Sequence, residues 1–274
     1  MGAQIYFRSS DPHVTHEAIN QPIGSRFLSH SHDYYELLLF KSGCASYIVE
    51  GRRYPLQKNT LIITRPFDIH RIYIEKLDIY ERYSIIYDAA TKIPRIEQAI
   101  PKNIDIIHLR DGHPILDLFS KMDYYHEHLE EADFKRLLCF LSEEIFYNVI
   151  ISAKSMDSES VASTNPLLQR AVKYIEEHLI DLSSIDELCE ALFITKSHLH
   201  HIFSNQMQIT PKKYILSKRL SLAKEILNTG KKPTSVYSQC GFNNYSTFYR
   251  EYKRYFGYPP SDNTDPTHRH EFND

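Results

Sequence analysis

The apolar residues of the chain follow two different periods, one before and one after Pro114. From Arg26 to Tyr87, short runs rich in Val, Ile, Leu and Tyr are separated by turn signals. Short apolar runs at this spacing predict the antiparallel strands of a sandwich or barrel. The expected strands are YELLLF, SYIVE, RRYPL, TLIITR, HRIYIE and ERYSIIY, and the expected breaks are Ser42-Gly43, Glu50-Gly51, Lys58-Asn59, Phe67-Asp68 and Leu77-Asp78.

After Pro114 the apolar residues recur at helical spacing. A stripe of this kind predicts a helix of about 20 residues with one buried face. The stripe consists of Phe134, Leu137, Leu138, Leu141, Ile145 and Val149. The segment ILDLFSKMDYYHEHL before it predicts a second helix. We expect the two helices to cover the open side of the barrel and, near residues 115–151, to form the seam of a homodimer.

A polar and aperiodic segment, KSMDSESVASTN, divides the chain in two. Segments of this composition are typical of linkers. We therefore expect a sensor and dimerisation domain over residues 1–153, a linker over 154–165, a helical domain over 166–261 and a polar tail over 262–274. The predicted fold class is α+β and multidomain, with an antiparallel β-barrel and its helices followed by an all-α domain.

The helical part contains one local pattern twice. The stretch SIDELCEALFITKSHLHHIFSNQM predicts a helix capped by Ser184, a tight turn and a second helix capped by Thr195. The stretch PTSVYSQCGFNNYSTFYREYKRYFG predicts the same unit again, with a turn at Gly241 and a cap at Asn243 or Asn244. The helix TPKKYILSKRLSLAKEILNTG joins them. Two such units on one chain indicate a double helix-turn-helix domain.

Net charge differs between the two parts of the chain. The segment from Ala191 to Tyr258 contains eleven Lys or Arg and two acidic residues, a formal charge of +9, which leaves −12 for the rest of the chain. This asymmetry indicates a basic module that binds a polyanion. The alternative is a solvated, lysine-rich surface.

Two segments carry a specific resemblance. ITPKKYILSKRLSLAKEILNTG and CGFNNYSTFYREYKRYFGYPPSD resemble the signature of the AraC/XylS family of transcriptional regulators, and the resemblance extends from Pro166 to Ser261. It implies recognition helices that enter successive major-groove segments of promoter DNA, about 34 Å apart. RNA polymerase is a further expected partner if the protein is an activator. Gln208 stands where the family usually has glycine, so we expect a different backbone solution at that helix end.

The resemblance also implies which side chains contact DNA. Ser197, His200 and His201 of the first unit correspond to base-facing positions, as do Tyr245, Ser246 and Arg250 of the second. Arg250 has the bidentate fork that fits O6 and N7 of guanine. The expected phosphate contacts are Lys212, Lys213, Thr247, Lys253 and Arg254.

The first part of the chain has a resemblance of its own. GSRFLSHSHDYYELLLFKSG resembles the first cupin motif and NTLIITRPFDIH the second, with Asp68 in place of the usual glycine, so the expected barrel is of cupin or jelly-roll type. Residues i and i+2 of a strand face the same side. The histidines and the glutamate can therefore point into the barrel together. In metal-binding cupins the positions that match His30, His32, Glu36 and His70 hold a divalent ion.

Three roles for these residues are open. In the first, no cofactor is required, and a small organic effector such as a sugar is bound by His30, His32, Tyr34, Glu36 and His70. In the second, the same pocket holds zinc, nickel, iron or manganese, which suit three imidazoles and a carboxylate. In the third, the residues are structural. Further candidate ligand contacts are Tyr35, Tyr47, Tyr73, Arg26 and Arg65.

The favoured interpretation is a ligand-responsive, sequence-specific DNA-binding regulator and not an enzyme. The alternative is a metal-dependent cupin enzyme or metal sensor fused to a DNA-binding module. Without a signal peptide or a long apolar span, we expect a cytoplasmic protein with no membrane partner. The scattered cysteines are expected to be reduced and mostly buried. They are Cys44, Cys139, Cys189 and Cys240.

Overall fold

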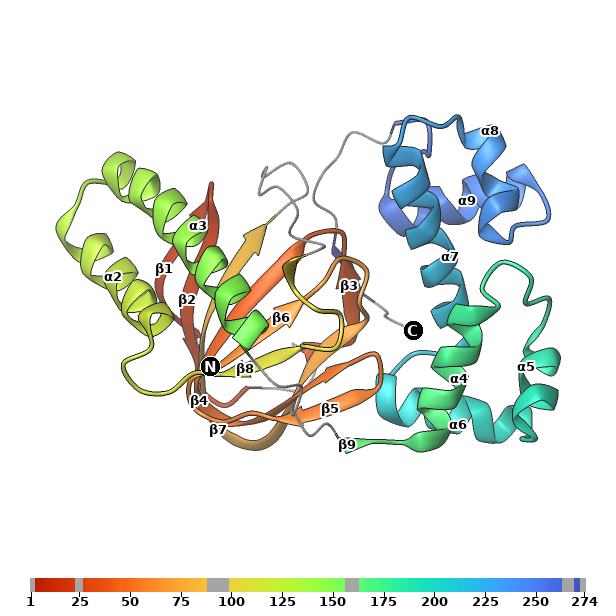
Figure 1. The fold of residues 1–274 in the computed structure, drawn as a ribbon, viewed down its shortest axis with the longest axis horizontal. Helices are drawn as coiled ribbons and strands as arrows, with labels where there is room; N and C mark the ends of the chain where they lie inside the picture. Colours follow the sequence, from red (N-terminus) through yellow and green to blue (C-terminus); the bar gives the residue numbers. More distant parts are fainter. Residues whose placement is uncertain (1–2, 23–26, 88–98, 156–162, 263–268, 272–274) are drawn as a thin grey trace.

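A computed structural model describes residues 3–22, 27–87, 99–155, 163–262 and 269–271, and shows a β-rich domain followed by a helical domain (Figure 1). This arrangement confirms the predicted fold class. The strands are β1 (Ala3–Ser10), β2 (His13–Ile19), β3 (His30–His32), β4 (Tyr35–Val49), β5 (Arg52–Pro55), β6 (Thr60–Thr64), β7 (His70–Tyr87), β8 (Ile106–His108), β9 (Ser163–Thr164) and β10 (Arg269–Glu271). The helices are α2 (Pro114–His128), α3 (Glu131–Ser155), α4 (Pro166–Glu177), α5 (Ile185–Leu192), α6 (Lys196–Met207), α7 (Pro211–Asn228), α8 (Pro233–Val236), the 3₁₀ turn η2 (Tyr237–Cys240) and α9 (Tyr245–Phe256).

Two long antiparallel strands, β4 and β7, form the centre of the sheet and pair along most of their length. Strand β2 extends the sheet beyond β7, while β5 and β6 both pair with β4. The predicted breaks at Ser42-Gly43 and Leu77-Asp78 are therefore wrong, because each lies inside one continuous strand. Register shifts on either side of Ser42 mark bulges, which bend a strand without ending its pairing.

Strands β1 and β2 were not predicted. Strand β1 is an edge strand with a mostly exposed surface, and its apolar side chains do not alternate cleanly. The turn at Glu50-Gly51 is as predicted and joins β4 to β5, and both of its residues have positive φ angles, 48° and 74°. This is the backbone of the two-residue hairpin turns that match strand twist.

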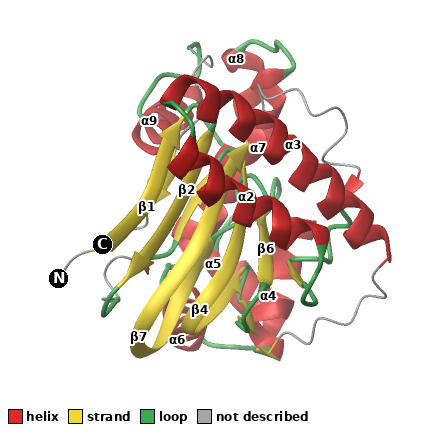
Figure 2. Ribbon diagram, turned by 90° about the vertical axis from the view of Figure 1, so that its left-hand side faces the viewer, coloured by secondary structure: helices red, strands yellow, loops and turns green. Residues whose placement is uncertain are grey.

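Alternation along β4 sends successive side chains to opposite sides of the sheet. Leu37 and Leu39 belong to a core shared with α2 and α3, whereas Leu38 and Phe40 belong to a second core inside the curved sheet. Helices α2 and α3 lie across the outer face of the strands (Figure 2). The predicted stripe of α3 is buried there, except for the half-buried Leu137. These helices therefore leave the inner side of the sheet free for a pocket.

The helical domain has one core, to which all of its helices and both turns contribute. The helix starts are as predicted, because each capping side chain accepts a backbone N–H of the first turn. The caps are Asn165, Ser184, Thr195, Thr210 and Asn244. The first helix of the second unit is short, with one turn of α8 followed by η2. Among the helices that the structure describes, none is long and apolar enough to cross a membrane.

The end of α6 corrects the expectation for Gln208. This residue takes the left-handed conformation itself, with φ 54° and ψ 34°, and its N–H donates to the Ser204 carbonyl. The helix therefore ends in the left-handed conformation that glycine would adopt at this position, and glutamine adopts it at some conformational cost.

The cysteines are only partly as predicted. Cys189 and Cys240 are buried, Cys44 is half-buried and Cys139 is exposed on α3, and all four are free thiols.

Candidate functional site

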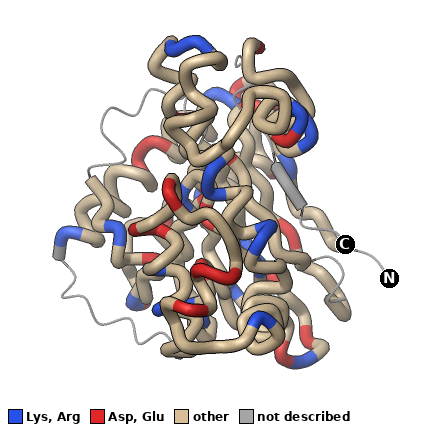
Figure 3. Tube along the Cα trace, turned by 90° about the vertical axis from the view of Figure 1, so that its right-hand side faces the viewer, with Lys and Arg blue, Asp and Glu red and all other residues tan. Residues whose placement is uncertain are grey.

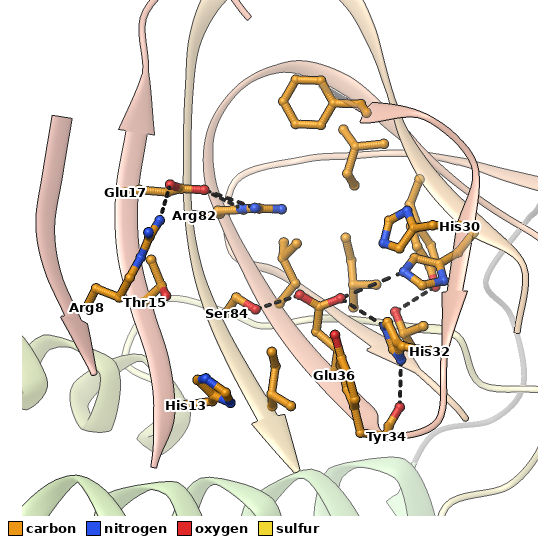
Figure 4. A pocket seen from close by; sticks show the side chains of 18 of the residues that line it. Arg8, His13, Thr15, Glu17, His30, His32, Tyr34, Glu36, Arg82 and Ser84 are labelled. Atoms are coloured by element: carbon orange, nitrogen blue, oxygen red, sulfur yellow. Dashed lines mark hydrogen bonds and ion pairs between the residues drawn. The ribbon is translucent and has the colours of Figure 1, made fainter. Parts of the chain in front are cut away.

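A cavity of about 320 Å³ lies inside the curved sheet, and its lining is drawn in Figure 4. All five residues predicted to bind an effector line it: His30, His32, Tyr34, Glu36 and His70. Strand β3 contributes the imidazoles of His30 and His32. His70, at the start of β7, contributes the third, and it lies opposite His30 in the antiparallel pairing of β3 with β7. Glu36 comes from β4, so the candidate site is assembled from three strands.

The three imidazoles are held in one tautomer by the backbone. In His30, His32 and His70, Nδ1 lies 2.8–2.9 Å from the carbonyl oxygen of a residue two positions away. A carbonyl can only accept, so Nδ1 carries the proton, and Nε2 of the neutral ring is left with its lone pair. One ligand nitrogen of each ring lies within 4.8 Å of the others. The rings thus present a cluster of acceptors.

Two of these ring nitrogens make no hydrogen bond to the described part of the protein. Within the described part of the chain, Nε2 of His32 and Nε2 of His70 are buried without a hydrogen bond. The Tyr34 ring stacks on His32 with 3.8 Å between centroids and fixes the plane of that imidazole. Buried polar atoms without partners are rare and costly, which makes them markers of sites that bind something.

Glu36 adds a carboxylate to the cluster. Its Oε2 lies 3.5 Å from Nε2 of His32 and 3.8 Å from Nε2 of His70, while Ser84 donates to Oε1 at 2.6 Å. Burial alone would raise the pKa of Glu36, but contact with His32 and the charge of Arg82 hold it well below its usual range. Burial and the neighbouring imidazoles lower the pKa of His70. An ionised carboxylate beside three imidazoles is a donor set that suits a divalent cation.

The opposite wall of the cavity carries hydrogen-bond donors. Arg82 of β7 donates to Glu17 of β2 at 2.9 Å, and Arg8 of β1 lies 3.6 Å from the same carboxylate (Figure 4). Apolar side chains separate the two walls: Phe27, Leu38, Ile62, Ile72 and Ile86. The sequence analysis missed Arg8 and Glu17 because it missed β1 and β2, and Arg82 lies in the expected strand ERYSIIY without a feature that marks it.

The other ligand contacts expected from sequence divide into two groups. Tyr47 lines the cavity and hydrogen-bonds Thr64 at 2.9 Å. Tyr35 packs toward the core under α2 and α3, and Tyr73 lies outside the cavity below the Arg53 guanidinium, at 4.7 Å. These two tyrosines do not reach the site.

Arg65, expected at the barrel mouth, does not line the cavity. Arg65 pairs with the buried carboxylate of Asp105 at 3.0 Å and donates to two backbone carbonyls, so its role is structural. Arg26 lies outside the described residues. The arginines that do line the cavity are Arg8 and Arg82.

The predicted DNA-contacting side chains lie on the outer faces of the helical domain. Helix α6 buries Leu199, Ile202 and Phe203, and α9 buries Phe248 and Tyr252, as predicted. The outward residues of these helices and of α7 divide by exposure. Exposed are Ser197, His200, His201, Lys212, Ser246, Arg250, Lys253 and Arg254; half-buried are Lys213, Tyr245 and Thr247.

Part of the positive charge of the helical domain is used inside the protein. Lys218 and Lys224 pair with carboxylates of the β-rich domain, and Arg219 donates to the carbonyls of Leu179 and Leu182. The remaining basic positions are spread over several segments of this side of the molecule (Figure 3). The surface charge available to a polyanion is therefore smaller than the sequence count.

A ligand cavity in a β-rich domain, joined to two helix-turn-helix units with free outer faces, defines a ligand-binding transcription regulator. Comparison with known families agrees. Residues 15–122 match the AraC-like ligand binding domain, and residues 188–264 match a helix-turn-helix domain. The chain is an AraC-family transcription regulator with a ligand-binding domain and a DNA-binding domain.

The relatives are themselves described as regulators. The chain is 35% identical over 133 residues to the probable transcriptional regulator LumQ of Photobacterium leiognathi, which covers 48% of this chain and 53% of LumQ. It thus spans about half the length of that relative. It is 24% identical over 246 residues to the transcriptional activator RhaS of Escherichia coli, with 86% of this chain and 87% of RhaS covered. The matched relatives are regulators, so the enzyme alternative is not favoured.

Solved structures with a similar chain include ToxT from Vibrio cholerae O395, at 15% identity and a TM-score of 0.38, with 93% of this chain and 97% of ToxT covered. The AraC-like transcriptional activator CuxR matches at 15% identity and a TM-score of 0.34, over 76% of this chain and 72% of CuxR.

Proposed function

We propose that this regulator adjusts its affinity for promoter DNA when a small polar molecule binds among His30, His32, Glu36 and His70. The observation that carries the proposal is the pair of buried Nε2 atoms, on His32 and His70, that make no hydrogen bond within the described chain while the two side chains line a cavity. A ligand that donates hydrogen bonds to them removes the cost of leaving buried acceptors unsatisfied.

The chemistry of the two walls limits the ligand class. With Nδ1 protonated, a neutral imidazole offers only a lone pair at Nε2, and an ionised carboxylate also only accepts, so with the rings in this form this end of the cavity suits hydroxyl groups and repels a carboxylate. The guanidinium of Arg82, at the other end, suits an acceptor oxygen. The volume of about 320 Å³ is near the lower limit of ligand pockets, about 300–1,000 Å³. A monosaccharide or a small hydroxy acid fits these constraints.

A divalent metal is the second candidate, and the donor set fits it. Metal-binding histidines usually donate their second ring N–H to a carbonyl or carboxylate. His30, His32 and His70 do this through Nδ1. The metal would be held by these three imidazoles with Glu36, and when bound it would supply a Lewis-acidic position for an oxygen of the effector. The protein would then act as a metal sensor or a metal-assisted effector sensor.

A thermal-shift screen of the full chain tests both candidates. Sugars, hydroxy acids and divalent metals are added with and without chelator, since a ligand at a hundred times its Kd stabilises a protein by about 2.7 kcal/mol. Stabilisation by a metabolite in the presence of chelator supports the first candidate, and stabilisation only by metal supports the second. His70→Ala should abolish either shift, while His198→Ala, on the exposed face of α6, should leave it unchanged. A shift that survives His70→Ala would show that the ligand binds elsewhere.

The proposed working form is a homodimer that acts on promoter DNA in the cytoplasm. Helix α3 supports this, because it exposes apolar side chains along one side. Phe140 is 60% exposed, Tyr147 53% and Ile151 65%. Large exposed apolar side chains in a row mark interaction surfaces. A dimer built on this row brings up to four recognition helices to one promoter, and RNA polymerase becomes a further partner if the regulator activates transcription.

A further inference from the structure

Strand β3 lies between the cavity and the helical domain, at the side of the sheet nearest α7 (Figure 1). Its side chains alternate, as in any strand. His30 and His32 line the cavity. The residues between and beside them, Ser29, Ser31 and Asp33, are buried and bond to the helical domain. One short segment therefore touches both functional parts of the molecule.

The three outward residues reach three different helices. The Ser29 hydroxyl donates to the last carbonyl of α6 at 2.5 Å. The Ser31 hydroxyl bonds the Tyr255 phenol of α9 at 2.8 Å. Asp33 pairs with Lys224 of α7 at 2.6 Å. Both recognition helices and the helix that joins them are thus attached to the strand that carries two of the three imidazoles.

The pair between Asp33 and Lys224 is the ion pair among these three attachments. The two side chains are 3% and 5% exposed. The Lys224 ammonium also donates to the Tyr258 phenol and lies 5.0 Å above the rings of Phe256 and Tyr258. Removal of one member of a buried pair leaves an unpaired charge in a medium of low dielectric. This pair therefore restricts the two domains to arrangements in which β3 and α7 stay together.

At the start of β7, as at β3, neighbouring residues face the cavity and the helical domain in turn. His70 lines the cavity, whereas its neighbour Ile69 belongs to the core of the helical domain. The Ile69 N–H donates to Glu50, which also accepts from Tyr214 at 2.5 Å and Lys218 at 2.6 Å. The third imidazole is thus also one residue away from a contact with the helical domain.

The remaining edge of β3 is paired with the C-terminal segment. Strand β10 forms an antiparallel ladder with β3, in which Arg269 lies opposite His32 and Glu271 opposite His30. Because β10 follows the second helix-turn-helix unit in the chain, it links that unit to β3 through the backbone.

We propose that β3 transmits the occupancy of the cavity to the recognition helices, with Ser31 and Asp33 as positioning residues. A ligand that draws His30 and His32 together moves their backbone. Ser31 and Asp33 share that backbone, so their partners on α9 and α7 must follow or lose their bonds. The ligand then shifts the balance between two domain arrangements by its different affinity for them. This inference rests on the proposed function, since it needs a ligand in the cavity.

The first test needs no ligand. DNA sites are selected from a random pool with the full-length protein, and the Kd for a selected site is measured for wild type, His32→Ala, Asp33→Asn and the double variant. If β3 carries the signal, the effects on Kd deviate from additivity by about threefold or more, because coupled neighbours are not additive. Additive effects overturn the proposal. His32→Ala combined with Asp117→Asn, an exposed carboxylate on α2, should be additive.

The second test uses Ni²⁺ as the probe and measures its binding and its effect on DNA affinity separately. Asp33→Asn and the milder Ser31→Ala should bind Ni²⁺ as wild type does, while the response of DNA affinity to Ni²⁺ falls by at least half. A variant with an unchanged response counts against the strand as the route. If wild type binds no Ni²⁺, nickel is excluded as the metal of this site, and the ligand-free cycle still decides the proposal for β3. Ser31→Ala loses only one hydroxyl, so it serves if Asp33→Asn does not fold.

Discussion

At the scale of single residues, the tautomer of three imidazoles decides what the cavity can bind. The Nδ1–H of each ring donates a hydrogen bond to a backbone carbonyl. In the neutral ring, Nε2 then has a lone pair that can accept a hydrogen bond in the cavity. The nearby Glu36 also offers lone pairs only. Such an end attracts O–H donors or a cation, and the guanidinium of Arg82 gives the other end the opposite preference.

Arg250 offers a prediction at the same scale. Its side chain is 69% exposed on α9, and its ion-pair contact with the neighbouring Glu251 is long, at 3.7 Å, so its guanidinium can reach a base. Arg250→Ala should weaken binding to a selected site by about 1–3 kcal/mol and leave non-specific binding nearly unchanged. Competition titrations against random DNA measure both. Equal losses on both DNAs would make Arg250 a phosphate contact.

The thiols differ in reactivity for reasons visible in the structure. Burial raises the pKa of Cys240 to about 11, so about one thiol in a thousand is deprotonated at pH 8. Cys139 is exposed on α3. Iodoacetamide at pH 8 should therefore modify Cys139 first and Cys240 only after unfolding. Peptide mass spectrometry follows each site, and early modification of Cys240 in the native protein would contradict the burial.

At the scale of elements, the turn between β4 and β5 depends on one glycine. Gly51 has φ 74°, and a Cβ added there would lie 2.4 Å from the Leu168 side chain of α4. Gly51→Ala should therefore lower the free energy of unfolding through backbone strain and through a clash at the domain contact, by about 2–4 kcal/mol together. Urea denaturation measures the change.

Gly112 is the matched control for this substitution. Its φ is 78°, but none of the described residues has an atom within 4 Å of the position that a Cβ would take. Gly112→Ala should show the strain alone, about 1 kcal/mol. Adding Leu168→Ala to Gly51→Ala should recover part of the loss, and equal losses at the two glycines would remove the domain contact from the explanation.

The exposed row on α3 gives a second prediction for an element. If α3 forms the dimer seam, Phe140→Glu places a charge in an apolar contact, and the protein should change from dimer to monomer. Light scattering after size exclusion gives the mass of each species. Glu190→Lys, on α5, should leave the mass unchanged. A dimer that tolerates Phe140→Glu must use another surface.

Helices were predictable from sequence and long strands were not, for a local reason. Capping residues such as Thr195 and Asn244 bond to backbone N–H groups within one turn, so the neighbouring residues in the sequence are enough to predict where the helix starts. A bulge at Ser42 looks in sequence like a turn, because Ser and Gly serve both. Whether the chain reverses or merely bends is decided by pairing with β7, which lies far along the sequence. The cavity residues were predicted because a resemblance supplied them, whereas Arg8, Glu17 and Arg82 had no local signal.

At the scale of the whole molecule, the basic residues of the helical domain lie in two places: some at the contact with the β-rich domain and some on the surface. Lys218 and Lys224 count toward the positive charge of the segment from Ala191 to Tyr258, yet Lys218 is half-buried against Glu50 and Lys224 is buried against Asp33. Only the fold distinguishes a lysine that joins domains from one that faces DNA. Likewise, Ser31 has no feature in sequence that marks it as a contact to Tyr255, since the two residues lie 224 positions apart.

This distinction predicts how DNA binding responds to salt. Each phosphate contact releases counterions and contributes about −0.9 to the slope of log K against log salt concentration. Lys212 is exposed at the start of α7, so Lys212→Ala should reduce the slope by about 1. Lys224 is buried in the domain contact, so Lys224→Met should change the affinity without changing the slope. Lys121→Ala, on the exposed face of α2, should change neither.

Fluorescence anisotropy titrations of a labelled site between 50 and 200 mM salt, roughly the range over which such contacts lose most of their affinity, give these slopes. Because the buried lysines release no counterions, the wild-type slope should reflect the exposed basic residues alone and be smaller than the +9 charge of the segment from Ala191 to Tyr258 would give. A slope near zero would mean that the helical domain does not grip phosphates. A slope that drops in Lys224→Met would mean that the domains separate on DNA and release this lysine to the backbone, so that binding itself opens the contact with β3.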